Sequence, residues 1–148
     1  IMLELLARGG MRIGEVLKIT PQDIAENKLI IQNPKSGREK EFVFIPRKLM
    51  NRLKEYVAEH NISFFQRIFP ISYTAAWVLV KKAGRIVEIN LKPHDLRRHA
   101  ATFASRSGTP IEIVSKVILR HADLSTTQRY LGKVDDAEAT RWVENLYG

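Results

Sequence analysis

The chain has 148 residues, of which 45% are hydrophobic, and its 24 basic and 16 acidic side chains leave a formal net charge of +8. This length and composition fit one domain around one hydrophobic core. The absence of cysteine excludes disulfides, thiolate metal sites and cysteine nucleophiles, and the longest apolar run, residues 75–80, is too short to cross a bilayer.

Taken in chain order, the sequence predicts mostly helices with one β-hairpin. Apolar periodicity and capping signals predict helices at residues 1–8 and 11–19, a single turn at 20–23, strands at 29–32 and 41–45, helices at 47–60, 72–83, 93–107 and 109–119, and two more that begin near residues 125 and 135. Asn33-Pro34-Lys35-Ser36-Gly37 is typical of a turn between the strands, whereas residues 63–71 show no clean periodicity. The predicted fold class is therefore α+β, mainly α-helical with a small antiparallel β-sheet.

The excess positive charge is concentrated in residues 34–54 and residues 81–98. In the first stretch, seven basic side chains face two acidic ones. A polyanion is the natural partner of such a surface, and nucleic acid is the commonest polyanion. A basic surface that serves only solubility is the alternative.

The segment from His94 to Tyr130 gathers residues suited to phosphate chemistry. His94 and Arg97 are three residues apart, so they project from one face of the predicted helix. A tyrosine nucleophile has an ordinary pKa of about 10, so it needs a proton acceptor and a positive field. With His121, the segment offers two imidazoles, a guanidinium and a phenol. This set can hold a phosphate and attack it with the tyrosine, with His94 as the proton acceptor.

The remaining roles require residues from other parts of the chain. Arg12 lies near a helix start and, together with Arg97, can hold the non-bridging oxygens of a phosphodiester. Lys35, at the hairpin tip, can protonate the leaving 5′-oxygen, and His121 can donate to a non-bridging oxygen. Metal catalysis fits poorly, because His94 and His99 are five residues apart and do not share a helical face.

Three motifs resemble those of the tyrosine recombinases, that is, the phage integrase and Xer-like site-specific recombinases. They are Gly10-Met11-Arg12-Ile13-Gly14-Glu15, His94-Asp95-Leu96-Arg97-Arg98-His99, and Leu119-Arg120-His121 followed by Ser125-Thr126-Thr127-Gln128-Arg129-Tyr130. The lysine of the family's β-hairpin matches Lys35 by position, with Lys40 as a neighbouring alternative. The resemblance covers nearly the whole chain, so residues 1–148 are expected to form the catalytic domain and to adopt its fold.

The resemblance implies an enzyme that cuts and rejoins double-stranded DNA through a 3′-phosphotyrosine and a free 5′-hydroxyl, with no metal or other cofactor. Tyr130 would be the nucleophile, His94 the general base and Lys35 the general acid, and the other members would stabilise the transition state. The implied catalytic set is Arg12, Lys35, His94, Arg97, His121 and Tyr130. The basic side chains expected to contact DNA are Arg38, Lys40, Arg98 and Arg120.

The resemblance also implies assembly into a tetramer on DNA through the C-terminal segment. The apolar stripe of Trp142, Val143 and Leu146 would dock into a neighbouring protomer, and an intramolecular core helix is the alternative. Family members carry an upstream DNA-binding domain, and a helical pattern already runs at Ile1, so we expect the chain to be a fragment. A cytoplasmic, DNA-associated protein of prokaryotic or viral origin is implied.

One residue departs from the family pattern, since Arg120 stands where a glycine usually precedes the histidine of the third motif. If that position needs a left-handed backbone, arginine is strained there and the placement of His121 is affected. Two alternatives to a recombinase follow. One is a type IB topoisomerase that relaxes DNA without exchanging strands, and the other is a basic DNA-binding module that has lost catalysis.

Overall fold

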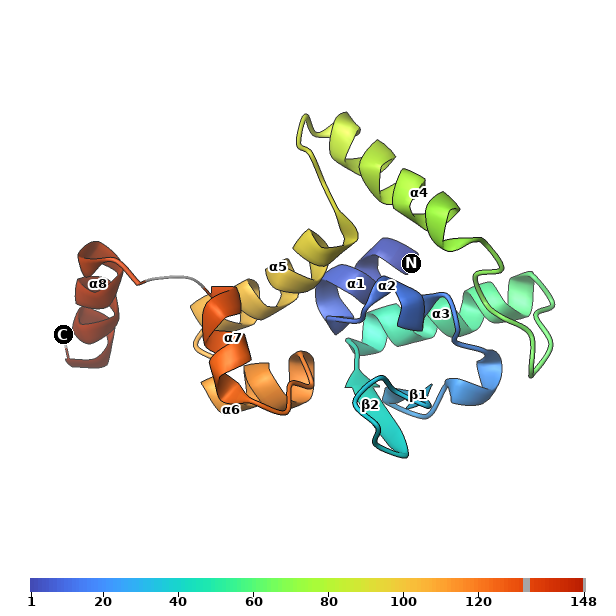
Figure 1. Cartoon of the computed structure of the whole chain (residues 1–148), viewed down its shortest axis with the longest axis horizontal. Coiled ribbons are helices and arrows are strands. Elements are labelled where there is room, and N and C mark those ends of the chain that lie inside the picture. The colour runs from blue at the N-terminus through green and yellow to red at the C-terminus, as the bar shows by residue number, and fades with distance from the viewer. Residues whose placement is uncertain (132–133, 148) are drawn as a thin grey trace.

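The computed structural model describes residues 1–131 and 134–147, and the side chain of Tyr130 lies outside that description. The described chain is mainly helical with a two-stranded antiparallel sheet, which confirms the predicted α+β class (Figure 1). The elements are α1 (Met2–Gly9), α2 (Ile13–Val16), the 3-10 turn η1 (Pro21–Asp23), β1 (Lys28–Gln32), β2 (Lys40–Phe44), α3 (Arg47–Glu59), α4 (Tyr73–Ile86), α5 (Pro93–Arg106), α6 (Ile111–Ile113), the π-helical turn η2 (Val114–Ile118), α7 (Leu124–Leu131) and α8 (Asp136–Tyr147). Within the described ranges, no helix is long and apolar enough to span a membrane.

The main core lies where α1, α2, α3 and α4 meet the β-hairpin. In the hairpin, Leu29 is opposite Val43 and Ile31 is opposite Glu41, and all four side chains are buried on the inner face. Burying a leucine or valine side chain contributes about 1.5–3 kcal/mol. Both phenylalanines of β2 are exposed instead. The predicted hairpin is confirmed, and one of its inward positions holds a carboxylate.

Most helix ends follow the predicted signals. Gly10, at φ 64°, ends α1, and the hydroxyl of Ser72 accepts a 3.1 Å hydrogen bond from the N–H of Ala75 at the start of α4. The prediction that Gly84 ends this helix was wrong, because α4 continues past it. A Cβ on Gly84 would lie 2.6 Å from the Cβ of Leu91. Glycine is required there for close packing against the segment that follows the helix.

Two predicted helices differ in length or type. The helix expected at residues 11–19 is only the four-residue α2, because Arg12 has an extended backbone (φ −77°, ψ 147°) and acts as its N-cap. The helix expected at residues 109–119 is divided into the single turn α6 and the π-helical η2. In η2, the N–H of Leu119 bonds the carbonyl of Val114 across five residues, the π-helical spacing.

A second, smaller core joins α5, η2 and α7. Ala101, Val114 and Leu119 are fully buried in it. The C-terminal helix α8 reaches the end of α5 through an ion pair of 2.9 Å between Arg106 Nε and Glu138 Oε1, and no residue of α8 is buried. The chain between η2 and α7, which includes His121, is therefore fixed from both sides by packed elements.

Candidate active site

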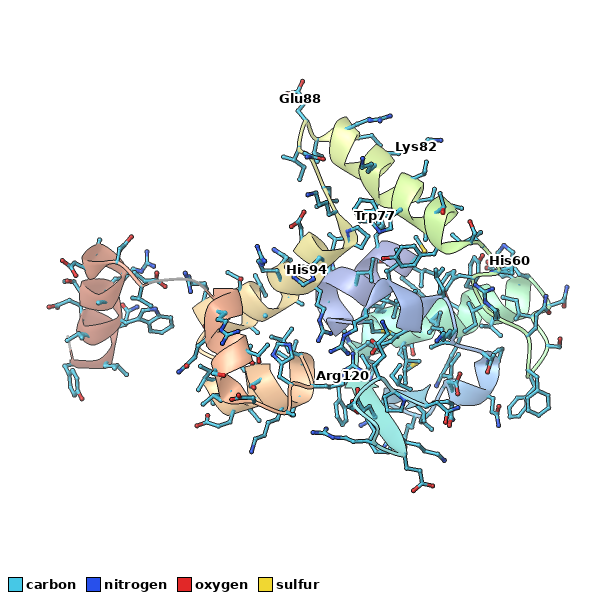
Figure 2. The ribbon with its side chains drawn as sticks, viewed as in Figure 1. His60, Trp77, Lys82, Glu88, His94 and Arg120 are labelled. Atoms are coloured by element: carbon cyan, nitrogen blue, oxygen red, sulfur yellow. The ribbon has the colours of Figure 1, made fainter. Side chains whose placement is uncertain are left out.

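A cavity of about 350 Å³ opens among the start of α2, the β-hairpin, α4 and the start of α5. Four residues predicted from the sequence line it: Arg12, Lys35, His94 and Arg97. They come from three well-separated segments, so the fold brings them together. Trp77 also lines the cavity and projects from α4 toward the start of α5 (Figure 2). Sequence reasoning missed it, because an aromatic residue on an amphipathic helix looks like any packing residue.

Arg12 is held in place by Glu15. The Glu15 carboxylate accepts the backbone N–H of Arg12 on Oε2 at 2.8 Å and its Nη1 on Oε1 at 3.0 Å. Such charge-assisted bonds fix both the start of α2 and the direction of the guanidinium. The Arg12 side chain stays 39% exposed, so it remains accessible to a ligand in the cavity. These contacts give Glu15 a supporting role beside Arg12.

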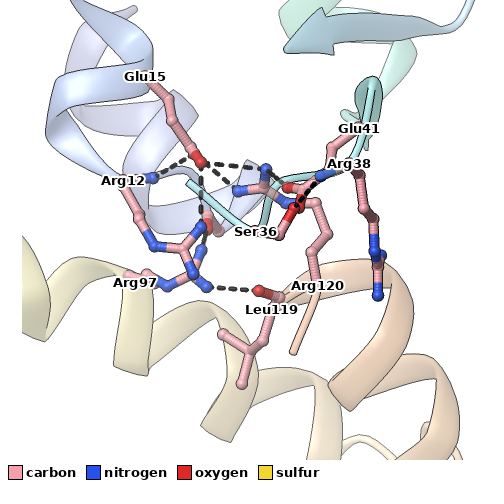
Figure 3. Close-up of polar contacts among 9 residues, drawn as sticks. Arg12, Glu15, Ser36, Arg38, Glu41, Arg97, Leu119 and Arg120 are labelled. Atoms are coloured by element: carbon pink, nitrogen blue, oxygen red, sulfur yellow. Dashed lines mark hydrogen bonds and ion pairs between the residues drawn. The ribbon is translucent and has the colours of Figure 1, made fainter. Parts of the chain in front are cut away.

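Arg97 is a buried guanidinium, 2% exposed, that joins two loops. It donates to the backbone carbonyl oxygens of Gly10 and Leu119, and Figure 3 shows the second of these bonds. The first carbonyl precedes the segment of Arg12, and the second precedes the segment of His121. Arg97 therefore holds these two segments together at the cavity that it also lines.

His94 lies in the first turn of α5 and is exposed. Its pKa is lowered from the usual 6.5, first by partial burial and then by the positive charges of Arg98 and Arg97, while Asp95 acts in the opposite direction. The imidazole is therefore neutral at neutral pH and is able to accept a proton.

His121 experiences the same positive field more strongly. Its pKa is lowered from 6.5 to about 4, first by burial and then by the charges of Arg97, Arg12 and Arg120. His121 follows Leu119, whose carbonyl accepts from Arg97, and Arg120, whose guanidinium bonds Glu15, so the chain holds it beside the cluster around the cavity. Its Nδ1 lies 2.9 Å from the hydroxyl of Thr127 in α7. Five of the six predicted catalytic residues are thus gathered in one region.

Tyr130, the sixth, belongs to α7 three residues after Thr127. Its side chain lies outside the described residues, so its role as nucleophile stays a prediction. The helix α7 lies beside His121, because Thr127 is fully buried and contacts His121. α7 also packs against α5 and η2.

Arg120, which was expected to contact DNA, is buried in the fold. Its side chain is only 3% exposed, with Nη2 2.7 Å from Glu15 Oε2 and Nη1 2.7 Å from Glu41 Oε2 (Figure 3). A guanidinium enclosed by two carboxylates is not available to a duplex. The charges also act on Glu15: burial alone would raise its pKa, but the hydrogen bond and charge of Arg120, with those of Arg12, lower it below its usual value.

The backbone of Arg120 is left-handed, with φ 56°. This conformation costs a non-glycine residue about 1–2 kcal/mol, so the strain foreseen from the sequence is present. Glu41 was missed as a functional candidate, although it had a signal. It alternates with Val43 and Ile45 at inward positions of a strand, and a charge at such a position predicts a buried partner.

The remaining basic candidates lie at the surface. Lys35, Arg38 and Lys40 are exposed on the hairpin, and Arg98 is exposed on α5. The N–H of Arg38 donates to the Ser36 hydroxyl within the turn, at 3.4 Å (Figure 3). Exposure on elements that border the cavity is compatible with phosphate contacts on either side of a bound strand. Their contact with DNA stays a prediction.

Residues 1–136 match the model of the phage integrase family. The chain belongs to this family. A curated relative, tyrosine recombinase XerA of Pyrococcus horikoshii, is 31% identical over 140 residues, covering 88% of this chain and 48% of the relative. The chain spans about half the length of the curated relatives it matches. The resemblance stated from the motifs is thus confirmed at the level of the family.

Solved structures support the same fold. The crystal structure of XerA recombinase superposes with a TM-score of 0.76 at 21% identity, covering 98% of this chain and 55% of that one. XerH site-specific recombinase bound to a palindromic difH substrate superposes with a TM-score of 0.75 at 20% identity, covering 96% of this chain and 43% of that one. The predicted recombinase catalytic-domain fold is confirmed.

Proposed function

We propose that this chain cuts and rejoins DNA strands as the catalytic domain of a site-specific recombinase. The observation that carries the proposal is the cavity where Arg12, Lys35, His94 and Arg97 meet, with His121 in the field of the two arginines. The two guanidiniums suit the binding of an anionic substrate. The primary amine and the two imidazoles of lowered pKa suit the transfer of protons to and from it. Relatives named as tyrosine recombinases favour strand exchange over relaxation by a topoisomerase.

The proposed reaction is a transesterification on a phosphodiester. Arg12 and Arg97 hold the non-bridging oxygens. The oxygen of Tyr130 attacks phosphorus as its proton passes to His94, and the bond from phosphorus to the 5′-oxygen breaks. Lys35 gives that oxygen a proton, which leaves a 3′-phosphotyrosine and a 5′-hydroxyl. His121 donates a hydrogen bond to a non-bridging oxygen in the transition state.

DNA binding would be mainly electrostatic. The net charge of +8 and the exposed Arg38, Lys40 and Arg98 support contacts to phosphates. Because the chain spans about half the length of its curated relatives, we also propose that a second, upstream domain binds the duplex together with this one.

Self-association is proposed to use α8. Val143 is 54% exposed and Leu146 is 71% exposed, whereas Trp142, the third residue of the stripe, is half-buried. The two exposed residues favour docking on a neighbouring protomer over an intramolecular core helix. An apolar stripe left exposed on a short helix is suited to a groove on a neighbouring protomer. A tetramer on DNA is the assembly proposed from the family resemblance.

The test is covalent capture on a nicked duplex whose cleaved end diffuses away and prevents religation. A pool of sequences replaces the unknown target site, and protein concentrations saturate the duplex in a shift assay. The wild-type chain is expected to give an adduct that survives SDS. Tyr130→Phe should lose the adduct and keep its DNA affinity, while the control Tyr147→Phe, changed at an exposed tyrosine of α8, should keep both.

Two results would contradict the proposal. An adduct that persists in Tyr130→Phe would exclude this tyrosine as the nucleophile. A wild-type chain that saturates the duplex without forming any adduct would support the DNA-binding module without catalysis.

A further inference from the structure

The strongest unassigned feature is the buried charge network around Arg120. Its four members carry two positive and two negative charges: Arg12, Arg120, Glu15 and Glu41. Arg120 and Glu41 are each 3% exposed. Charges this deeply buried need partners to remain in the fold, and these two are paired with each other. The network extends over three parts of the chain, namely the start of α2, the strand β2 and the loop between η2 and α7.

On one side, the network reaches Arg12. Glu15 accepts Arg120 through both oxygens, at 2.7 Å and 3.2 Å, and accepts Arg12 on the same two oxygens. The carboxylate lies between the two guanidiniums, so its position fixes the direction of both. Arg12, which lines the cavity, is therefore held by Glu15, and Glu15 is in turn held by Arg120.

On the other side, the network reaches the hairpin of Lys35. Glu41 lies opposite Ile31 in the register, one pair from the last pair of the ladder. Its carboxylate, 3% exposed, is 2.7 Å from Arg120 Nη1. The turn that bears Lys35 begins directly beyond that last pair, so fixing Glu41 fixes the base of the turn.

The network is also joined to His121 through the backbone, because His121 is the next residue in the chain after Arg120. A left-handed residue reverses the chain direction locally, and glycine would adopt this conformation without strain. The fold nevertheless holds an arginine at φ 56°. The backbone at this position does not require an arginine, so its side chain is the part that the fold uses.

We propose that Arg120 is a positioning residue that sets the Lys35 hairpin and Arg12 in register with His121. The inference rests on the proposed function. It goes further by assigning to Arg120, through Glu41, the placement of the general acid relative to the group that holds the phosphate. Arg120 itself touches neither substrate nor the reacting atoms.

The test separates placement of the acid from general structural support. In a substrate with sulfur in place of the 5′-oxygen, the leaving group departs as a thiolate. It needs no proton, because a thiol has a pKa of about 8.5. Loss of correct acid placement therefore slows cleavage of the 5′-oxygen substrate and spares the 5′-sulfur substrate. The variant is Glu41→Gln, which keeps the shape and removes the charge, and the control is Glu39→Gln, exposed on the same hairpin.

Single-turnover cleavage is measured on both substrates below the unfolding midpoint of each variant. Glu41→Gln is expected to slow 5′-oxygen cleavage by about tenfold or more, part of the 10²–10⁴-fold typical of general acids, and to cut the 5′-sulfur substrate near the wild-type rate. Glu39→Gln should match wild type on both. Equal slowing on both substrates, or no slowing on either, would overturn the inference.

A second variant covers the case in which Glu41→Gln fails to fold. Arg120→Lys keeps the charge, but an ammonium cannot hold two carboxylates with a planar fork. Because Arg120 also bonds Glu15, both substrates are expected to be cleaved more slowly, with the larger loss on the 5′-oxygen substrate. The two hypotheses fail differently. A wild-type chain that forms no Tyr130-dependent adduct on either substrate contradicts the proposed function, whereas a wild-type chain that cleaves both, beside variants without selective loss, contradicts only the role of Arg120.

Discussion

Replacing Arg120 by glycine sets two opposing energies against each other. Glycine removes the left-handed strain, a gain of about 1–2 kcal/mol. It also leaves Glu41, 3% exposed, without its partner, and removing one partner of a buried ion pair costs about 3–5 kcal/mol. The loss is the larger effect, so Arg120→Gly is expected to destabilise the fold by about 1–4 kcal/mol.

Thermal unfolding followed by circular dichroism measures this balance. One kcal/mol shifts the Tm of a domain of this size by about 2–4 °C, so a decrease of about 2–16 °C is expected. The double variant Arg120→Gly/Glu41→Gln should recover part of it, because the unpaired charge is then gone. A Tm equal to or above that of wild type in the single variant would refute the reasoning, since backbone strain would then outweigh the ion pairs.

Three further outcomes are expected. Gly84→Ala should lower the Tm, because its Cβ would lie 2.6 Å from neighbouring atoms, whereas Gly14→Ala has nothing within 4 Å and should be neutral or stabilising; equal effects would contradict the packing argument. The folded-state pKa of His121 is about 4, below 6.5 for the unfolded chain, so the unfolded chain binds the extra proton and stability to urea should fall as pH falls from 6.5 toward 4. His121→Gln should show a shallower fall, and an unchanged slope would exclude His121 as a contributor. Arg98→Ala should weaken binding to all DNA sequences alike and reduce the salt slope by about 0.9, and a sequence-selective loss in shift assays would instead indicate base contact.

Local signals in the sequence predicted the elements well where a turn or cap decides the structure. The turn at Asn33–Gly37 predicted the hairpin, and Ser72 predicted the start of α4 because its hydroxyl caps the helix. Gly84 led to the wrong helix end, because a glycine occurs both where a helix ends and where another segment packs closely against a helix. Only the segment that packs against it distinguishes the two, and that segment is a matter of tertiary structure.

The sequence predicted which residues belong to the candidate site, but not how they contact one another. The motifs indicated Arg12, His94 and His121, because phosphate chemistry demands those residue types. The burial of Arg120 was not predictable, since its partners Glu15 and Glu41 are 105 and 79 residues away. An arginine has the same signature in a sequence whether it faces solvent or a buried carboxylate.

The bonds of Arg97 have a consequence for how the protein is made. They join carbonyls 87 and 22 residues away, and closing such long loops is a late and slow step of folding. A nascent or partly unfolded chain therefore carries every residue of the proposed site and none of its geometry. The proposed strand cleavage would therefore depend on a completely folded domain.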